Sequence, residues 1–277
     1  NMWMGTQYGF VIKCTNSNWH DTVNAFKIMH RFKGRITKMV TDKKGFVWVC
    51  TDRYGLYKLN ASDGSIADHY DEESPAGRRL QTAGANDVFQ YNDSILLIAS
   101  KGLNVLNTNT NKISFINTNY GKESNSLHSI LRDKQGYLWL AFYDGICRME
   151  LGKNIFLYFG SEDGISNKHF QLNASTVLDD GRILLGTTTD FLVFDPLKIN
   201  LPKISAPVII SGFLPADKNL QVDSLLRLKK IILPYYNNTF TINLTTFSYQ
   251  NDHAILYMLE GDNDKWQLAA NNQVTFN

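Results

Sequence analysis

The chain has 277 residues, of which 43% are hydrophobic and 19% charged, and its formal net charge is +2. That length supports one large or two modest domains, and the even charge balance argues against nucleic acid or an anionic membrane surface as the main partner. No apolar run approaches the roughly 20 residues that cross a bilayer, and the first residues lack the basic and long apolar regions of a signal peptide.

Five strand-like segments along the chain share one pattern, in which a large anchor residue is followed by small residues and a turn. The anchors are separated by 45, 49, 42 and 45 residues and are Trp3, Trp48, Leu97, Trp139 and Leu184. A period of about 45 residues, with only strand-type segments between the anchors, is typical of a β-propeller with four strands in each blade. We therefore expect Trp3, Trp48 and Trp139 to lie in the blade core rather than in a ligand site.

One unit, residues 35–70, shows the strands of a blade. The runs "RITKMVTD", "FVWVCT", "LYKLN" and "IADHY" are rich in β-branched and aromatic residues and are separated by turn residues. Glycine supplies positive φ at turns, and small residues let wedge-shaped blades approach closely; the recurring glycines are Gly55, Gly145 and Gly186. No long segment has the 3.6-residue period of a helix, so helix content should be very low.

The three cysteines, Cys14, Cys50 and Cys147, lie in strand-like apolar stretches with no metal-type spacing. We expect them to be buried thiols that behave as small hydrophobic residues. The sequence shows no metal-binding or cofactor motif, so no metal and no cofactor are predicted.

Residues 42–56 and 133–146 resemble the two-component regulator propeller repeat, which runs from Asp and Gly through a Trp-containing strand to a further Gly. The fifth unit is similar to the terminal blade of such propellers, and its matching residues are Asp163, Gly164, Asn167, Phe170, Gly181, Gly186, Phe194 and Pro196. One residue departs from the family pattern: Asp190 stands where the family usually has Gly. Since Asp tolerates the left-handed region better than most residues, we expect the turn to survive.

From residue 201 the repeat no longer recurs, and a Pro-flanked segment leads into further strands. The run "TFTINLTTF" alternates with period two, and "AILYMLEG" reads as a strand that ends in a turn. This part resembles the Y_Y_Y domain, a β-sandwich that follows these propellers in hybrid two-component receptors. The matching residues are Leu233, Tyr235, Asn238, Phe240, Phe247, Tyr257, Leu259, Glu260, Gly261 and Trp266.

The predicted fold is all-β. Residues 1–200 should form about four and a half four-stranded blades, the C-terminal part of a larger propeller. Residues 201–277 should form an immunoglobulin-like β-sandwich of the Y_Y_Y type, incomplete at its C-terminus. Because a closed propeller usually needs more blades, we expect the missing ones to come from upstream sequence.

Candidate ligand contacts are residues in connections that the repeat does not explain. Trp19 and His20 lie in one long connection, where Trp suits stacking on a sugar ring but could equally pack on its own blade. Arg78 and Arg79 lie in another, where guanidinium groups suit a carboxylate or sulfate, although solvated charge is the simpler interpretation. Lys168 and His169 precede the first strand of the last blade, near the usual binding loops of propellers.

The sequence has no motif for a hydrolase, a P-loop or a metalloenzyme, and its Asp42, Asp133 and Asp180 fall in repeat turns. We therefore expect this segment to be no enzyme itself, although the resemblance implies a histidine kinase domain in the full-length parent. Two alternatives stay open: a periplasmic propeller enzyme of the lyase type, and a protein-interaction scaffold.

The resemblance implies the periplasmic part of an inner-membrane hybrid two-component receptor. Such receptors detect oligosaccharide breakdown products and regulate genes for polysaccharide utilisation. It also implies an oligosaccharide ligand and a homodimer formed through the Y_Y_Y region. Contact with the membrane would come only through a downstream transmembrane helix, and none with nucleic acid is expected from this segment.

Overall fold

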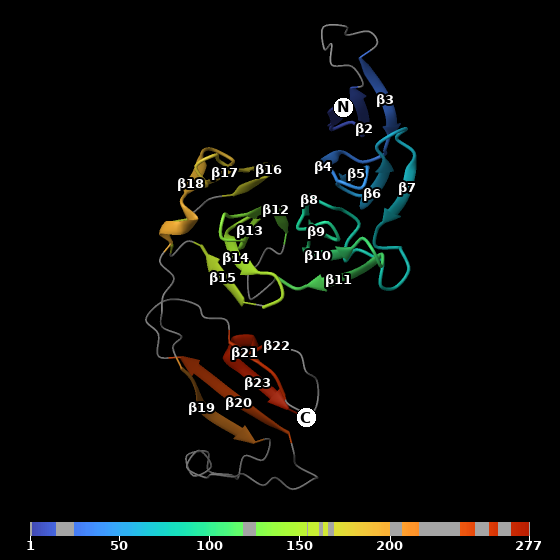
Figure 1. Ribbon diagram of the computed structural model, residues 1–277. Coiled ribbons are helices and arrows are strands. Elements are labelled where there is room, and N and C mark those ends of the chain that lie inside the picture. The colour runs from blue at the N-terminus through green and yellow to red at the C-terminus, as the bar shows by residue number, and fades with distance from the viewer. Residues whose placement is uncertain are drawn as a thin grey trace. The chain divides into compact units, whose positions relative to one another are not determined.

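The computed structural model describes residues 2–14, 25–118, 126–153, 155–160, 163–165, 169–199, 207–215, 239–246, 255–259 and 267–276 (Figure 1). The chain divides into two compact units, Asn1–Ile199 and Asn200–Asn277. The regular structure of the described parts is almost wholly strand, and their helical segments are short 3-10 turns, among them η2 (Pro196–Lys198) and η3 (Ala270–Asn272). The expected low helix content is therefore confirmed.

The described residues of the first unit form five antiparallel sheets. They are β1 (Met2–Gly5), β2 (Phe10–Cys14) and β3 (Phe26–Arg31); β4 (Ile36–Thr41), β5 (Phe46–Thr51), β6 (Leu56–Asn60) and β7 (Ile66–Tyr70); β8 (Asp87–Gln90), β9 (Ile95–Ser100), β10 (Gly102–Asn107) and β11 (Lys112–Ile116); β12 (Leu127–Arg132), β13 (Leu138–Phe142), β14 (Ile146–Glu150) and β15 (Ile155–Phe159); and β16 (Phe170–Val177), β17 (Ile183–Thr187) and β18 (Phe191–Phe194).

The second, third and fourth sheets are four-stranded meanders, as the repeat predicts. The first sheet holds the second to fourth strands of a blade, because Trp3 lies in β1 as Trp48 lies in β5. The fifth sheet has three strands among the described residues, not the four expected of a full blade. There the chain leaves the sheet after β18: Asp195 accepts a hydrogen bond from the Leu197 N–H (3.0 Å) and caps η2, which begins with Pro196.

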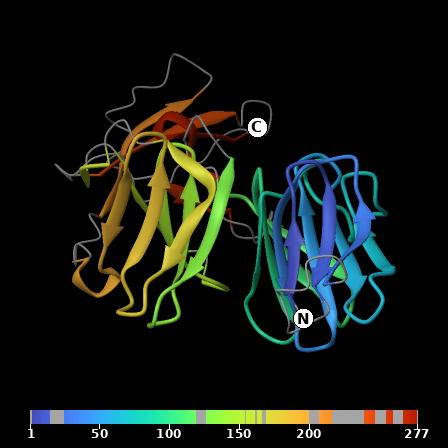
Figure 2. The ribbon, with the colours of Figure 1, turned by 90° about the horizontal axis from the view of Figure 1, so that it is seen from above.

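The hydrophobic core lies between successive sheets, which turn their faces toward one another (Figure 2). Trp48 is fully buried between the second and third sheets, and Trp139 is 2% exposed between the fourth and fifth. Trp3 is half-buried between the first and second sheets. The three cysteines are buried thiols, as predicted.

A buried aspartate–tryptophan pair explains the repeated Asp and Trp. The Trp48 indole Nε1–H donates to Oδ2 of Asp42 (2.8 Å), and Trp139 does the same to Asp133 (2.8 Å). The other carboxylate oxygen accepts two backbone N–H groups of the turn, at 2.9 Å each in both sheets. One side chain thus fixes both the turn and the core residue six positions later.

A second repeated contact joins each first strand to a neighbouring sheet. Thr37 Oγ1 donates to the Ala85 carbonyl (2.6 Å), Asn86 Nδ2 to that of Leu127 (2.8 Å) and His128 Nδ1 to that of Phe170 (2.8 Å). Asn173 Nδ2 donates to the carbonyl of Thr37. The donors are spaced by 49, 42 and 45 residues, the same spacings as the core anchors.

The bond from Asn173 to Thr37 brings β16 of the fifth sheet next to β4 of the second sheet. The four hydrogen bonds thus link the second to fifth sheets, and the first sheet, which packs on the second, is not part of this series. The expectation that further blades come from upstream sequence stays a prediction.

Two of the repeat glycines are required because the last residue of the fourth strand lies close to them. A Cβ on Gly55, whose φ is +68°, would lie 2.0 Å from the Tyr70 carbonyl oxygen, and one on Gly145 would lie 3.0 Å from that of Phe159. Asp190 does not have a positive φ, so the left-handed conformation expected of it is wrong. The turn itself is present, because the Thr187 N–H donates to the Asp190 carbonyl (2.8 Å) as the Phe142 N–H does to that of Gly145 (2.8 Å).

Gly186 serves packing rather than a turn, because a Cβ there would lie 2.8 Å from Cβ of Ala174 in the adjacent strand.

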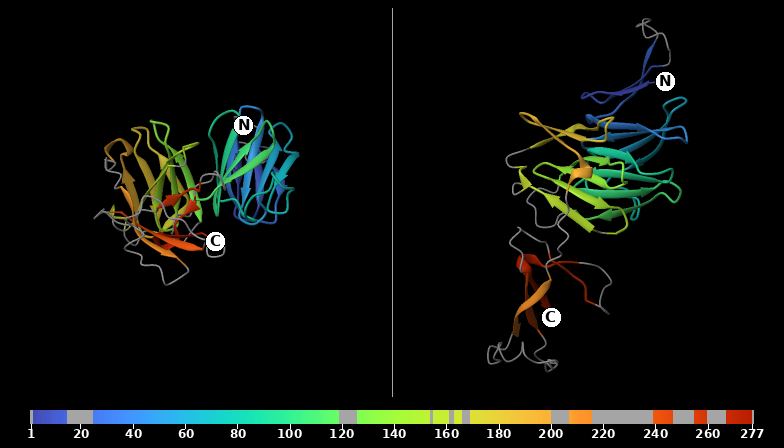
Figure 3. Two further views of the ribbon diagram at one scale, coloured as in Figure 1. Left: turned by 90° about the horizontal axis from the view of Figure 1, so that it is seen from below. Right: turned by 60° about the vertical axis from the view of Figure 1, so that its left-hand side comes forward.

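The second unit holds two small antiparallel sheets (orange to red in Figure 3). One has the order β19 (Val208–Pro215), β20 (Phe240–Thr246) and β23 (Gln273–Phe276), and the other pairs β21 (Leu256–Tyr257) with β22 (Gln267–Leu268). Ile255, Ala269 and Val274 are buried where the two sheets pack together.

Two details of the second unit differ from the sequence pattern. All seven residues of β20 are half-buried, so the expected alternation does not separate a core face from a solvent face. The paired part of "AILYMLEG" is only two residues long. The resemblance residues outside the described part of the chain are Leu233, Tyr235, Asn238, Phe247, Glu260, Gly261 and Trp266.

Candidate functional site

One edge of the first unit gathers the loops between second and third strands together with the connections between sheets. Backbone hydrogen bonds link them: Phe32 N–H to the Gly9 carbonyl (2.8 Å), Gly55 N–H to Ala83 (2.6 Å) and Phe170 N–H to Tyr143 (2.9 Å). We call this edge the loop face; its described residues are 6–9, 32–35, 52–55, 71–86, 101, 143–145, 163–165, 169 and 188–190.

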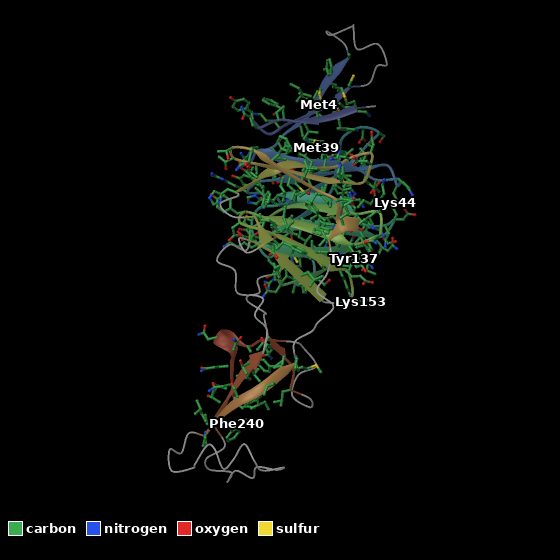
Figure 4. The ribbon with its side chains drawn as sticks, turned by 90° about the vertical axis from the view of Figure 1, so that its left-hand side faces the viewer. Met4, Met39, Lys44, Tyr137, Lys153 and Phe240 are labelled. Carbon is green, nitrogen blue, oxygen red and sulfur yellow. The ribbon has the colours of Figure 1, made fainter. Side chains whose placement is uncertain are left out.

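The other turns of the meanders lie on the opposite edge. They include Lys44, Tyr137 and Lys153, which lie along one margin of the molecule in Figure 4. Lys44 Nζ donates to Oδ1 of Asn109 (2.8 Å), so this edge is tied by its own contacts.

Exposed aromatic rings gather on the loop face. Tyr8, Tyr54 and Tyr143 are 71%, 39% and 42% exposed, and Phe191, directly after the loop of the fifth sheet, is 66% exposed. Four of the five second-to-third loops thus carry or adjoin an exposed ring. Each of these rings offers a separate surface on which a ligand could pack.

The best-formed arrangement, which we call the Tyr143 platform, consists of Tyr143, His169, Gln171 and Thr188. The Tyr143 and His169 rings are stacked, with centroids 4.4 Å apart and an interplanar angle of 13°. His128 meets the Tyr143 ring edge-on at 6.0 Å. Two loops from different sheets therefore build one solvent-exposed stack of rings, in which the ring faces that do not meet each other are left for a ligand.

Hydrogen bonds hold the platform in place. The Thr188 N–H donates to the His169 carbonyl (3.1 Å), and Gln171 Nε2 donates to Thr188 Oγ1 (3.1 Å). Burial lowers the pKa of His128, whose Nδ1–H is bound to the Phe170 carbonyl. The ring beneath the platform is therefore neutral at neutral pH.

This arrangement suits a sugar. A flat aromatic surface packs on the apolar face of a pyranose ring, and amide and hydroxyl groups beside it can bond the sugar hydroxyls. Gln171 and Thr188 supply those groups at the edge of the stacked rings.

Arg78 has a structural explanation. Its Nη2 lies 2.7 Å from both carboxylate oxygens of Asp68, and its guanidinium lies over the Tyr70 ring, with Cζ 5.2 Å from the centroid. Burial acts in the other direction, but bonds from the His69 N–H, the Tyr70 hydroxyl and Arg78 lower the pKa of Asp68. Arg78 thus anchors its long connection to its own sheet.

Of the other predicted ligand contacts, two are described by the structure and three are not. His169 lies in the Tyr143 platform, and Arg79 is exposed on the loop face. Trp19, His20 and Lys168 lie outside the described residues. A ligand role for any of these residues stays a prediction.

Sequence reasoning missed Tyr8, Tyr54 and Tyr143. A signal for them exists: each lies one or two residues before the glycine of its second-to-third loop. When the repeat units are aligned on their buried anchor residues, the recurring residue in this loop is the glycine, and the tyrosine beside it does not stand out.

Within the described parts of the chain, no group of three or more His, Cys, Asp or Glu side chains is arranged to hold a metal ion. The same parts contain no helix that is both long and apolar enough to span a membrane.

No protein-family model matches the chain. Among curated proteins, Histidine kinase P4 of Formosa agariphila is 25% identical over 167 residues, which is 56% of this chain and 12% of that protein. The chain thus spans a small part of the curated relative that it matches.

Among solved structures, the extracellular domain of a hybrid two-component system from B. thetaiotaomicron is 19% identical, with a TM-score of 0.50. The match covers 99% of this chain and 44% of that domain. A second such domain from the same organism is 16% identical, with a TM-score of 0.49. The chain is thus similar in sequence to a histidine kinase and has the fold of an extracellular domain of a hybrid two-component system.

Proposed function

We propose that this chain is the ligand-sensing part of a two-component receptor and binds an oligosaccharide at the Tyr143 platform. The observation that carries the proposal is the stacked, solvent-facing pair of Tyr143 and His169, built from loops of two sheets. The fold shared with extracellular domains of hybrid two-component systems supports a sensor rather than a catalyst.

In this proposal the parent protein is a hybrid sensor histidine kinase and response regulator, and this part of it lies in the periplasm. The ligand is a breakdown product of a polysaccharide, and the output is expression of genes for its use. The similarity to Histidine kinase P4 supports the kinase part of this proposal.

The second unit transmits the signal. As a Y_Y_Y-type sandwich, it would pair with its copy in a homodimer and pass a change of pose to a downstream transmembrane helix. Such coupling requires that the ligand favour one arrangement of the pair over another.

Calorimetric titration of the 277-residue chain with a panel of neutral and acidic oligosaccharides tests the proposal. We expect saturable binding of one glycan class, with intact sugar recovered afterwards. Tyr143→Ala should weaken binding by up to about tenfold, because an aromatic stack is worth about 0.5–1.5 kcal/mol, and Tyr143→Phe should retain it.

Tyr91→Ala is the matched control, because Tyr91 lies in a first-to-second turn on the opposite edge, where Arg132 Cζ is 4.8 Å from its ring centroid. Thermal unfolding of each variant checks that it is folded. Conversion of the sugar would favour the lyase alternative, and absence of binding across the panel would contradict the proposal and favour an interaction scaffold.

A further inference from the structure

We infer that the loop face holds a second binding site, around Tyr54, which takes an anionic group of the ligand, a carboxylate or a sulfate. The inference rests on the proposed function, because it specifies the chemical class of the oligosaccharide. We call Lys33, Arg35, Arg53 and Tyr54 the Tyr54 site.

Two loops build the Tyr54 site and are locked together. The Asp52 N–H donates to the Arg35 carbonyl (3.1 Å), and the Arg35 N–H donates to Oδ1 of Asp52 (2.9 Å). Gly34 lies directly against Tyr54, since a Cβ there would be 3.0 Å from Cδ2 of the tyrosine ring. Lys33 and Arg35 adjoin Gly34 in one loop, and Arg53 adjoins Tyr54 in the other, so three cationic residues lie next to the point where the two loops meet.

The backbone beneath the ring is also fixed. His69 Nε2 donates to the Tyr54 carbonyl (2.7 Å), while the Tyr54 side chain stays 39% exposed. A ring that is fixed at its backbone and partly exposed offers a surface for a sugar at little entropic cost.

Exposed cationic side chains favour an anion at this site. Lys33, Arg35 and Arg53 are all exposed. Of the acidic residues nearby, Asp52 lies beside Arg35, whose Nε is 3.8 Å from Oδ2, while Asp71, Glu72 and Glu73 lie in the connection after β7. Within the described part of the chain, no ion pair joins Lys33 or Arg53 to a carboxylate. These two cations are therefore available to an anionic group beside the exposed ring.

An arginine fork beside an aromatic ring is matched to an acidic sugar. The planar guanidinium binds a carboxylate or sulfate through two parallel hydrogen bonds, and the adjacent ring packs on the sugar itself. The described loops beside the Tyr143 platform, residues 143–145 and 188–190, carry Asp144 and Asp190 and no cation. Acidic substituents are therefore directed to the Tyr54 site rather than to the platform.

An array of immobilised oligosaccharides, probed with the 277-residue chain, tests the inference. Each carboxylated glycan is paired with its carboxyl-reduced form, and each sulfated glycan with its desulfated form. We expect the bound glycans to be acidic, and neutralisation to lower binding at least about tenfold. Which of the two acidic series binds distinguishes a carboxylate from a sulfate.

Arg53→Gln should lower affinity for the acidic glycan about tenfold, and added salt should weaken the wild-type complex. Lys112→Gln is the control of equal charge, because Lys112 begins β11 next to a turn on the opposite edge. Binding of neutral glycans only, or an unchanged affinity in Arg53→Gln, would overturn the inference and leave the proposed function standing. An array with no bound glycan would overturn both.

Discussion

The carboxylate of Asp133 holds three groups at once: two backbone N–H groups of its turn and the indole of Trp139. It is 6% exposed, so its partners cannot turn to water when the carboxylate is removed. Asp180 is the natural comparison. It accepts the Arg182 N–H at a similar turn (3.0 Å), but it is exposed and has no indole partner.

We expect Asp133→Ala to lower the free energy of unfolding by about 2–4 kcal/mol, because a buried indole N–H and two turn N–H groups lose their acceptor. Asp180→Ala should cost less than about 1 kcal/mol. Urea denaturation followed by tryptophan fluorescence measures both. Equal losses in the two variants would show that the indole bond contributes nothing.

The sequence explains these aspartates only in part. Their spacing to glycine predicts the turn, and the turn is there. The bond to Trp139 does not follow from the sequence, since a residue six positions along a strand comes into reach only once the hairpin has folded. The same limit applies to Tyr143 and His169, which lie 26 residues apart in the sequence and meet only across two sheets.

His128 makes stability depend on pH. Burial lowers its pKa below the ordinary value of 6.5, so the unfolded chain binds the proton more readily than the folded one. Its contribution is therefore complete above that value and is lost as the pH falls through the folded pKa. We expect the midpoint of urea unfolding to decrease as the pH is lowered from neutral into this range.

His128→Asn is the matched variant, because Asn86 occupies the equivalent position and donates to a carbonyl in the same way. The variant keeps a donor for Phe170 and removes the titrating ring, so its unfolding midpoint should fall less steeply with pH. If both proteins lose stability equally between neutral and acidic pH, His128 is not the group responsible.

At the scale of the strand and turn, the fourth strand of a sheet limits the side chain that can follow the second strand, because its last carbonyl lies beside that position. Gly55 combines a φ of +68° with the nearby Tyr70 carbonyl, whereas Gly77 has a φ of +83° and no atom within 4 Å of the point that a Cβ would occupy. An alanine at either position would be strained by its positive φ, but only an alanine at Gly55 would also clash with another atom.

Gly55→Ala should lower the free energy of unfolding by about 2–5 kcal/mol, the sum of left-handed strain and overpacking. Gly77→Ala should cost only the strain, about 1–2 kcal/mol. Chemical denaturation of the two variants side by side checks the difference. A Gly55→Ala variant that is no less stable than Gly77→Ala would mean that the carbonyl can move aside.

The regular blades could be predicted from the sequence because each repeats the same local chemistry: a turn, a buried anchor and a glycine. The fifth sheet could not be predicted in full. Its three strands resemble those of the other sheets up to Phe194, and then Asp195 and Pro196 start a 3-10 turn that the strand pattern does not anticipate.

At the scale of the whole molecule, both proposed sites belong to the first unit. The Tyr143 platform and the Tyr54 site lie within Asn1–Ile199, and the second unit has its own small core around Ile255, Ala269 and Val274. Oligosaccharide binding should therefore need the first unit alone, with the second unit left for the transmission that we propose.

We expect a protein that comprises residues 1–199 to bind the same oligosaccharide as the 277-residue chain, with an affinity within about threefold, because less than about 0.7 kcal/mol then depends on the second unit. Calorimetry on both proteins measures this, and near-ultraviolet circular dichroism shows whether the shorter one keeps its packed tryptophans. If the shorter protein is folded and its affinity is ten times weaker, the second unit contributes contacts to the ligand, and sensing and transmission share one surface.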